Sequence, residues 1–222
     1  MGRVITIDGP SGSGKGTIAK LVADRLGWGV LDSGALYRLV GYSAEKEGIC
    51  FDNVAKLCEV ALDMDVIFDG DNVLLNGEDV TREIRTETAG NNASKVAALP
   101  EVRAALLEWQ RSMAKAPGLV ADGRDMGTVV FPDAEVKVFL TASAEERAKR
   151  RYKQLKEKGI SVSLRDLVRD IQERDERDSS RDVAPLVAPV AALEVESTSL
   201  SIDEVLEKVM EKVSNTFPDL DV

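Results

Sequence analysis

The feature that most constrains this fold is a glycine-rich stretch, residues 9–17, between a buried strand and a helix. Residues 4–8 are β-branched or apolar up to a final aspartate, and residues 18–26 carry apolar side chains at helical spacing before Gly27. Glycines let successive backbone N–H groups point toward one anion, and the helix N-terminus and Lys15 add positive charge. This context predicts a phosphate-binding P-loop, and the alternative is a glycine-rich turn without a ligand.

The P-loop departs from the common pattern at one position. Gly16 follows Lys15, and the hydroxyl comes one residue later, at Thr17. The usual pattern places Ser or Thr directly after the lysine, where it contacts Mg²⁺. That contact therefore cannot be assumed for this chain.

Net charge and hydropathy limit the partners. The formal net charge of the 222 residues is −10, which argues against long nucleic acid or an anionic membrane as a partner. The chain enters a core strand without the basic and apolar segments of a secretory signal, and its apolar runs fall short of the ~20 residues that span a bilayer. We therefore expect a cytoplasmic protein without a membrane anchor.

The chain contains no histidine. Ser-His-Asp or Cys-His catalysis, histidine-ligated zinc and imidazole bases are therefore excluded. Cys50 and Cys58 lack C-x-x-C spacing and are expected to be core thiols in a reducing compartment. Phosphoryl transfer remains possible, because Lys, Arg and Mg²⁺ supply most of its catalysis.

Strands and helices alternate along most of the chain, which predicts a parallel sheet covered by helices. Expected strands are residues 4–8, 29–32, 118–122, 136–140 and 193–196. Expected helices are residues 18–26, 34–46, 54–62, 101–113, 143–158, 164–177 and 201–213, the last with Ser201 and Glu204 as a capping box. Residues 64–68 and 73–75 break the alternation as a hairpin around an Asp-Gly turn.

Three further clusters of polar residues are candidates for the site. Two of them follow predicted strands, and the third is an arginine-rich segment. In residues 32–38, Ser33 and Arg38 are candidates, with a helix N-cap and a surface arginine as the alternative. Asp122 ends a strand and is placed to hold the hydration shell of Mg²⁺, with a polar turn as the alternative. Arg174, Asp178 and Arg181 would share one face of a continuing helix, either over polyphosphate or as a solvated charged face.

Four motifs occur in order: Gly-x-Ser-Gly-x-Gly-Lys-Gly-Thr, Leu-Asp-Ser-Gly-Ala-x-Tyr-Arg, Asp-Gly-Arg-Asp-Met-Gly-Thr-Val-Val-Phe-Pro and Arg-Asp-x-Arg-Asp-x-x-Arg. Together they resemble the bacterial cytidylate (CMP) kinase family over residues 4–213. The P-loop alone is shared widely among nucleoside monophosphate kinases, but the ordered set is highly specific. The Gly-Lys-Gly-Thr departure also fits this group.

The resemblance implies an α/β fold of the P-loop NTPase type, with three α/β/α layers around a central parallel sheet. It further implies a single kinase domain with a core of residues 1–62, 100–158 and 183–222. A small α+β lobe of residues 63–99 would bind the acceptor, and residues 159–182 would form a helical lid. The family is also expected to be monomeric.

The implied reaction is transfer of the γ-phosphoryl group of ATP, with Mg²⁺, to CMP and dCMP. The catalytic residues would be Lys15, Arg124, Arg174 and Arg181, and Asp122 would order Mg²⁺ through water. The ATP phosphates would be held by Gly9, Pro10, Ser11, Gly12, Ser13, Gly14, Lys15, Gly16 and Thr17.

CMP would be bound by residues from the other motifs and from the segment around residues 92–103. Ser94, Arg103 and Asp125 would read the cytosine edge, because together they complement its amino donor and its acceptors. The full implied set is Ser33, Arg38, Ser94, Arg103, Arg124, Asp125, Arg174, Asp178 and Arg181.

Two other functions are alternatives to this one. A P-loop GTPase would read guanine with a Lys-x-Asp motif, which this sequence lacks. A kinase of another small acceptor, such as UMP, AMP or shikimate, remains the nearer alternative.

Overall fold

A computed structural model describes residues 2–70, 72–157 and 159–220. The chain divides into two compact units. The first unit contains the residues up to Asp32 together with those from Ser112 onward, and the second is Ser33–Arg111.

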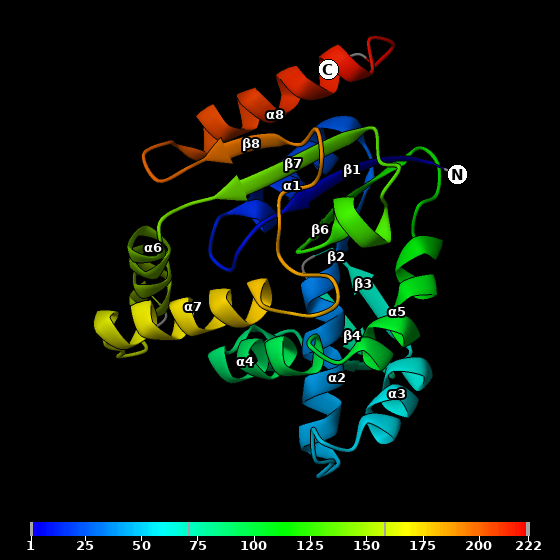
Figure 1. Cartoon of the computed structure of the whole chain (residues 1–222), viewed down its shortest axis with the longest axis vertical. Coiled ribbons are helices and arrows are strands. Elements are labelled where there is room, and N and C mark those ends of the chain that lie inside the picture. The colour runs from blue at the N-terminus through cyan, green and yellow to red at the C-terminus, as the bar shows by residue number, and fades with distance from the viewer. Residues whose placement is uncertain (1, 71, 158, 221–222) are drawn as a thin grey trace. The chain divides into compact units, whose positions relative to one another are not determined.

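The first unit is built on a parallel sheet with the strand order β2-β6-β1-β7-β8 (Figure 1). Its β1 strand is buried along nearly its whole length, as expected for a central strand covered on both faces. The predicted α/β class is confirmed. The strands are β1 (Arg3–Asp8), β2 (Gly29–Asp32), β6 (Gly118–Gly123), β7 (Val136–Thr141) and β8 (Leu193–Glu196).

Strand register brings polar residues to one edge of this sheet. Asp8, the last residue of β1, pairs with Gly123 of β6, and Asp32 of β2 pairs with Asp122. Ligands of parallel α/β sheets bind beyond the carboxyl ends of the strands. The three strand ends therefore position the candidate site.

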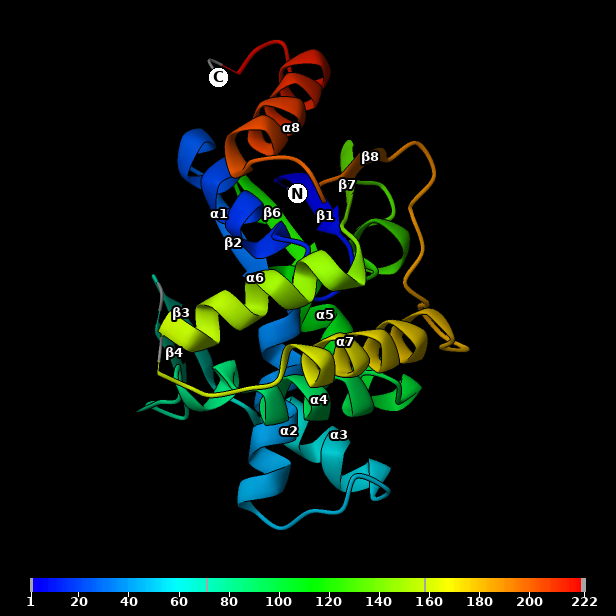
Figure 2. The ribbon, with the colours of Figure 1, turned by 90° about the vertical axis from the view of Figure 1, so that its left-hand side faces the viewer.

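Among the residues that the structure describes, the first unit contains four α-helices. Those named α6 and α7 lie side by side in both views (Figures 1 and 2) around an apolar cluster that includes Ala148 and Leu167. The capping box of Ser201 and Glu204 is present at the start of the last helix. The helices are α1 (Lys15–Leu26), α6 (Ala144–Glu157), α7 (Leu164–Ser179) and α8 (Ile202–Thr216), and a π-helical turn, Met126–Val130, follows β6.

The second unit combines helices with an antiparallel sheet. The predicted hairpin is confirmed, because β3 pairs antiparallel with β4; Asp71 of its turn lies outside the described residues, as does Lys158 at the predicted end of α6. The elements are α2 (Ser33–Lys46), α3 (Val54–Asp63), β3 (Val66–Asp69), β4 (Asn72–Leu75), β5 (Glu78–Asp79), the 3₁₀ turn Glu83–Arg85, α4 (Glu87–Val96) and α5 (Pro100–Ser112).

This unit is wider than the lobe of residues 63–99 expected from the sequence, which lies wholly within it. The reason is packing: α2 lies against α4, and Arg38 of α2 donates to the backbone oxygen of Ile84 at 2.7 Å. The apolar core of the hairpin accordingly includes Ala35 and Leu39 of α2.

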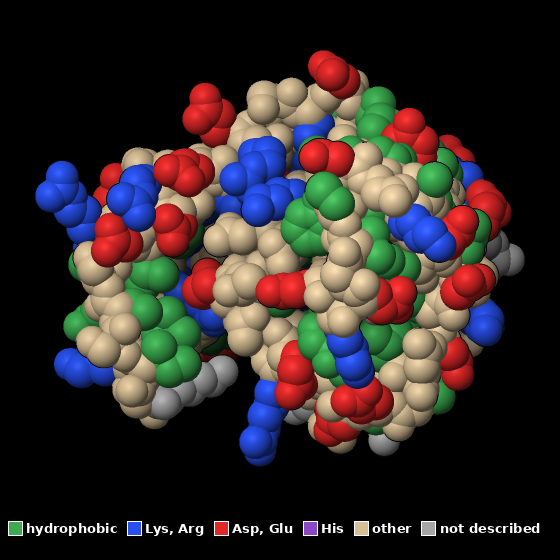
Figure 3. Space-filling model, turned by 90° about the horizontal axis from the view of Figure 1, so that it is seen from below, with side chains coloured by type: hydrophobic (Ala, Val, Ile, Leu, Met, Phe, Trp, Pro, Cys, Tyr) green, Lys and Arg blue, Asp and Glu red, His purple; other side chains and the backbone are tan. Residues whose placement is uncertain are grey.

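Both signs of charge are present on the surface. On the face drawn in Figure 3, Lys and Arg side chains are interspersed among Asp and Glu side chains. Within the described residues, the helices are too short or too polar to cross a membrane.

Candidate active site

The P-loop takes the backbone shape that its glycines predict. Gly9, Gly12 and Gly14 have φ angles of 155°, 77° and 95°, in the region that side chains other than glycine rarely adopt. Helix α1 begins directly after Gly14, at Lys15. The loop thus delivers a helix N-terminus and a lysine to the carboxyl edge of the sheet, where an anion would be favoured.

Lys15 is a buried cation beside a buried carboxylate. Its Nζ lies 3.3 Å from the backbone oxygen of Pro10 and 3.8 Å from Asp122 Oδ1. Burial lowers the pKa of Lys15, and the nearby Arg124 guanidinium lowers it further, whereas Asp122 raises it. Burial likewise raises the pKa of Asp122, and Lys15 opposes that shift. Each group keeps the other charged inside a desolvated site.

Asp122 fits the role of a water-mediated Mg²⁺ contact. Its Oδ1 is buried, lies 3.8 Å from Lys15 Nζ and has no partner at hydrogen-bonding distance among the residues that the structure describes. A metal-bound water would supply that partner. A Cβ at position 16 would lie only 3.0 Å from Asp122 Oδ2. The glycine after Lys15 therefore leaves this carboxylate more room than a residue with a side chain would.

Asp8 is a site residue that the sequence analysis did not identify. Its carboxylate is fully buried and accepts the backbone N–H groups of Met126, at 2.7 Å, and Gly127, at 2.8 Å. It thereby holds the turn that carries Arg124 and Asp125. An acidic residue that closes a buried strand just before a P-loop was the available signal.

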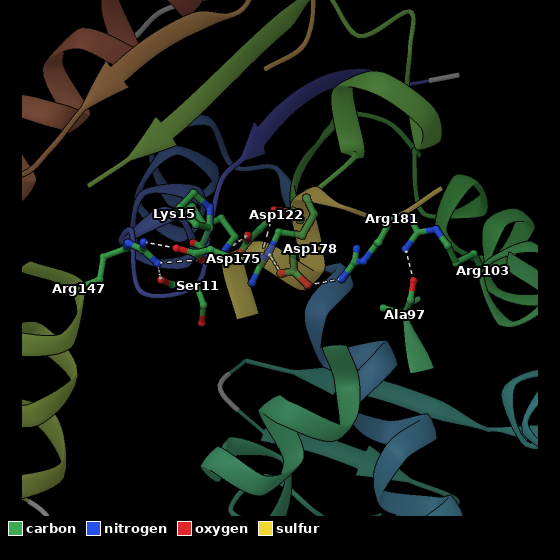
Figure 4. Close-up of polar contacts among 12 residues, drawn as sticks. Ser11, Lys15, Ala97, Arg103, Asp122, Arg147, Asp175, Asp178 and Arg181 are labelled. Atoms are coloured by element: carbon green, nitrogen blue, oxygen red, sulfur yellow. Dashed lines mark hydrogen bonds and ion pairs between the residues drawn. The ribbon is translucent and has the colours of Figure 1, made fainter. Parts of the chain in front are cut away.

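Arg124 and Arg181 pair with the buried carboxylate of Asp178; Figure 4 shows Asp178 and Arg181. Arg124 Nε donates to Asp178 Oδ2 at 3.0 Å, and Arg181 Nη2 donates to Asp178 Oδ1. The side chain of Asp178 is only 3% exposed. One carboxylate thus orients two guanidiniums from different parts of the chain.

The expectation that Arg174, Asp178 and Arg181 share a face of one helix is wrong for Arg181. Helix α7 ends at Ser179, and Ser180 makes the closing bond to the backbone oxygen of Glu176. The backbone oxygen of Asp178 accepts a hydrogen bond from the N–H group of Leu186, outside the helix. Arg181 therefore reaches Asp178 across a turn, while Arg174 and Asp178 are buried on α7 itself.

In the second unit, the predicted residues lie on three helices. Ser33 begins α2, and its hydroxyl donates to Gln110 Oε1 of α5 at 2.7 Å. Arg38, also on α2, bonds the backbone around the 3₁₀ turn, and Ser94 is buried on α4. Gln110, only 1% exposed, had no signal in the sequence beyond its helical position.

Arg103 is buried on α5 and held in two ways. Its Nη1 donates to the backbone oxygen of Ala97 at 3.1 Å, as Figure 4 shows. Its guanidinium also lies 5.4 Å from the centroid of the Tyr37 ring, within reach of a cation–π interaction.

The predicted residues are therefore brought together in groups. The first unit joins Lys15 to Asp122, and Arg124 to Asp178 and Arg181. The predicted cytosine-reading set is divided, with Asp125 in the first unit and Ser94 and Arg103 in the second.

Comparison with known proteins gives consistent results. The family model described as cytidylate kinase matches residues 5–215. A curated cytidylate kinase of Stutzerimonas stutzeri (strain A1501) is 57% identical over 218 residues, covering 96% of this chain and 95% of the relative. That of Aeromonas salmonicida (strain A449) is 58% identical over 214 residues, covering 95% and 93%. A solved structure of an uncharacterized protein from Eubacterium ventriosum ATCC 27560, 10% identical with a TM-score of 0.50, covers 96% of this chain and 98% of that one and is similar in fold alone.

Proposed function

This chain belongs to the cytidylate kinase family, and we propose that it transfers the γ-phosphoryl group of ATP to CMP, giving ADP and CDP. The observation that carries the proposal is the extent of the family match. It spans residues 5–215 and so includes every residue assigned to the site.

The donor side is the P-loop. Its backbone N–H groups bind the ATP phosphates, and the Lys15 ammonium lies beside the β- and γ-phosphates. Asp122 would hold Mg²⁺ through water, and the metal would supply charge neutralisation along the polyphosphate. Because Lys15 and Asp122 are buried, their electrostatic effect on the phosphates exceeds that of exposed groups.

The acceptor side needs no general base. The phosphate of CMP has a second pKa of ~6 and is largely dianionic at neutral pH. One of its oxygens attacks the γ-phosphorus, and the bond from that phosphorus to the β-phosphate oxygen breaks. Lys15, Arg124, Arg174 and Arg181 stabilise the charge on the transferred group.

CMP recognition is assigned to the residues predicted from the motifs and from the segment around residues 92–103. Arg38 and the arginines of the first unit bind its phosphate, and Ser33 lines the acceptor site. Asp125 accepts a hydrogen bond from the cytosine amino group, whereas Ser94 and Arg103 donate to its acceptors. Arg174 and Asp178 contact the sugar and its surroundings.

Turnover with four acceptors tests the proposal. Purified protein with ATP and Mg²⁺ is given CMP, dCMP, UMP or AMP in parallel, and the nucleoside diphosphate is measured by chromatography. CMP and dCMP are expected to give the highest kcat/KM, and Lys15→Ala controls for a contaminating kinase. Faster turnover of UMP or AMP would replace CMP with that acceptor.

We also propose a cellular location and an oligomeric state for the enzyme. A cytoplasmic monomer is proposed because both substrates are cytoplasmic metabolites and one chain carries all the assigned residues. Light scattering of the purified protein, with and without nucleotides, tests the monomeric state.

A further inference from the structure

Two arginines of α6, one turn apart, donate hydrogen bonds to carbonyl oxygens of the P-loop. Arg147 Nη1 lies 2.9 Å from the oxygen of Ser11, and Arg150 Nη1 lies 3.3 Å from the oxygen of Ser13. Figure 4 shows Arg147 directed at Ser11. In the sequence, both arginines belong to a highly charged helix and look like solvent-facing residues.

Arg147 is held rigidly. Its side chain is only 4% exposed, and its Nε donates to the backbone oxygen of Ala142 at 2.8 Å. It also forms a bidentate ion pair with Asp175 of α7. A Cβ at Gly12 would lie 3.2 Å from Arg147 Cβ, so this glycine allows the close approach.

Arg150 is held by a second set of acceptors. Its Nη2 donates to the backbone oxygen of Ser197 at 2.6 Å, and its Nε to Glu146 at 3.3 Å. The Ser197 hydroxyl lies 3.4 Å from the same Ser13 oxygen, but its one proton has a nearer acceptor, the backbone oxygen of Thr141 at 2.9 Å. Arg150 is therefore the main side-chain donor to the Ser13 carbonyl.

These contacts bear on phosphate binding because a peptide bond fixes the direction of an N–H group relative to the preceding C=O. In a trans peptide, the C=O of one residue and the N–H of the next point in opposite directions. Holding the carbonyls of Ser11 and Ser13 toward α6 therefore directs the N–H groups of Gly12 and Gly14 away from it. Peptides beside glycine otherwise reorient at little cost, because glycine adopts positive and negative φ alike.

We propose that Arg147 and Arg150 are positioning residues, which hold the Ser11–Gly12 and Ser13–Gly14 peptides with their N–H groups toward the phosphates. This inference rests on the proposed kinase function and names residues that prepare its donor site. The arginines act through the backbone, so each governs one glycine amide.

The test uses Arg147→Lys and Arg150→Lys, which keep the charge but lose the planar set of donors. Arg151→Lys is the matched control on the same helix, because Arg151 Nη1 bonds Gln154 of that helix. Inorganic tripolyphosphate, which has no base or sugar, is titrated into each protein by calorimetry. The same titration is followed through the amide signals of Gly12 and Gly14 in ¹H–¹⁵N spectra.

We expect each of the two variants to bind tripolyphosphate roughly tenfold more weakly, the effect of about one well-placed hydrogen bond to a charged group. Arg147→Lys should reduce the tripolyphosphate-induced shift of the Gly12 amide and spare that of Gly14. Arg150→Lys should do the converse, and Arg151→Lys should behave as the wild type.

Unchanged affinity in both variants would overturn the proposal. So would weaker binding with both glycine shifts intact, since that result indicates direct contact between arginine and phosphate. If one variant does not fold, the other decides by the same criteria. A wild type that binds tripolyphosphate but does not phosphorylate CMP would refute the proposed function and leave the result on the arginines standing.

Discussion

Arg124 Nε donates to Asp178 Oδ2 at 3.0 Å, although the two residues are 54 positions apart in the sequence. The other oxygen of Asp178 accepts a hydrogen bond from Arg181. A single buried carboxylate therefore orients both guanidiniums before any phosphate is bound. Orientation of this kind reduces the free-energy cost of ordering the arginines when the substrate arrives.

Replacement of Asp178 by Asn should destabilise the fold and weaken CMP binding. Asn keeps the shape, but its amino group faces a guanidinium, and loss of one partner of a buried ion pair costs about 3–5 kcal/mol. Urea denaturation and the KM for CMP measure the two effects. Asp170→Asn is the control, because its exposed pair with Arg169 is worth less than about 1 kcal/mol. Equal losses in the two variants would contradict the role given to Asp178.

Lys15→Ala should lower kcat much more than it changes the affinity for CMP. In the proposed mechanism the ammonium acts on the ATP phosphates and on the charge of the transition state, whereas CMP binds to other residues. Steady-state kinetics and calorimetry with CMP separate the two quantities. Lys20→Ala, an exposed change on the same helix, is the control. A kcat close to that of the wild type would show that Lys15 has no catalytic role.

Asp125→Ala should lower kcat/KM for CMP more than kcat/KM for UMP. The difference between the two losses should correspond to about 1–3 kcal/mol. The reason is that the cytosine amino group loses its acceptor, while uracil presents a carbonyl oxygen at that position. Parallel assays with both nucleotides measure the difference, and Asp133→Ala provides an exposed control. Equal losses would exclude Asp125 from base reading.

Asp8→Asn should change how stability depends on pH. Burial raises the pKa of Asp8 to about 7 from 3.8, despite its two backbone N–H donors, so folding takes up a proton between these values. The resulting stabilisation is fully present below about pH 4 and is lost as the pH rises through 7. Relative to the variant, the wild type should therefore lose up to about 1.4 kcal/mol per pH unit across that interval. Urea denaturation at pH 5 and pH 8 measures this, and a difference between the two proteins that does not change with pH would contradict it.

Residues 159–182 should become protected from hydrogen exchange when CMP and a non-hydrolysable ATP analogue bind together. The segment carries five arginines, at positions 165, 169, 174, 177 and 181. Their guanidinium groups form better bidentate hydrogen bonds with phosphate than with surface carboxylates. Closure would also exclude water from the reacting phosphoryl group. Mass spectrometry should show slower exchange across residues 174–181 and little change in β1. No change across residues 174–181 would rule out a lid in this segment.

The sequence by itself determined the local structure of this protein. Periodicity predicted the strands and helices, and the glycines of residues 9–17 predicted a loop with positive φ angles, because these signals depend on neighbours in the chain. The ordered motifs also identified the family. The first two depend on residues only a few positions apart, and the family follows from the order of four short motifs along the chain.

Tertiary structure decided which polar groups meet. Asp8 accepts hydrogen bonds from the N–H groups of Met126 and Gly127. Arg147 is buried against Ser11 and Asp175. Arg181 contacts Asp178 across a turn because α7 ends before it. No periodic pattern encodes such contacts, since an arginine on a charged helix has the same local sequence whether it faces water or a carbonyl oxygen. Its burial depends on strand order and helix packing, which place segments distant in sequence at the same edge of the sheet.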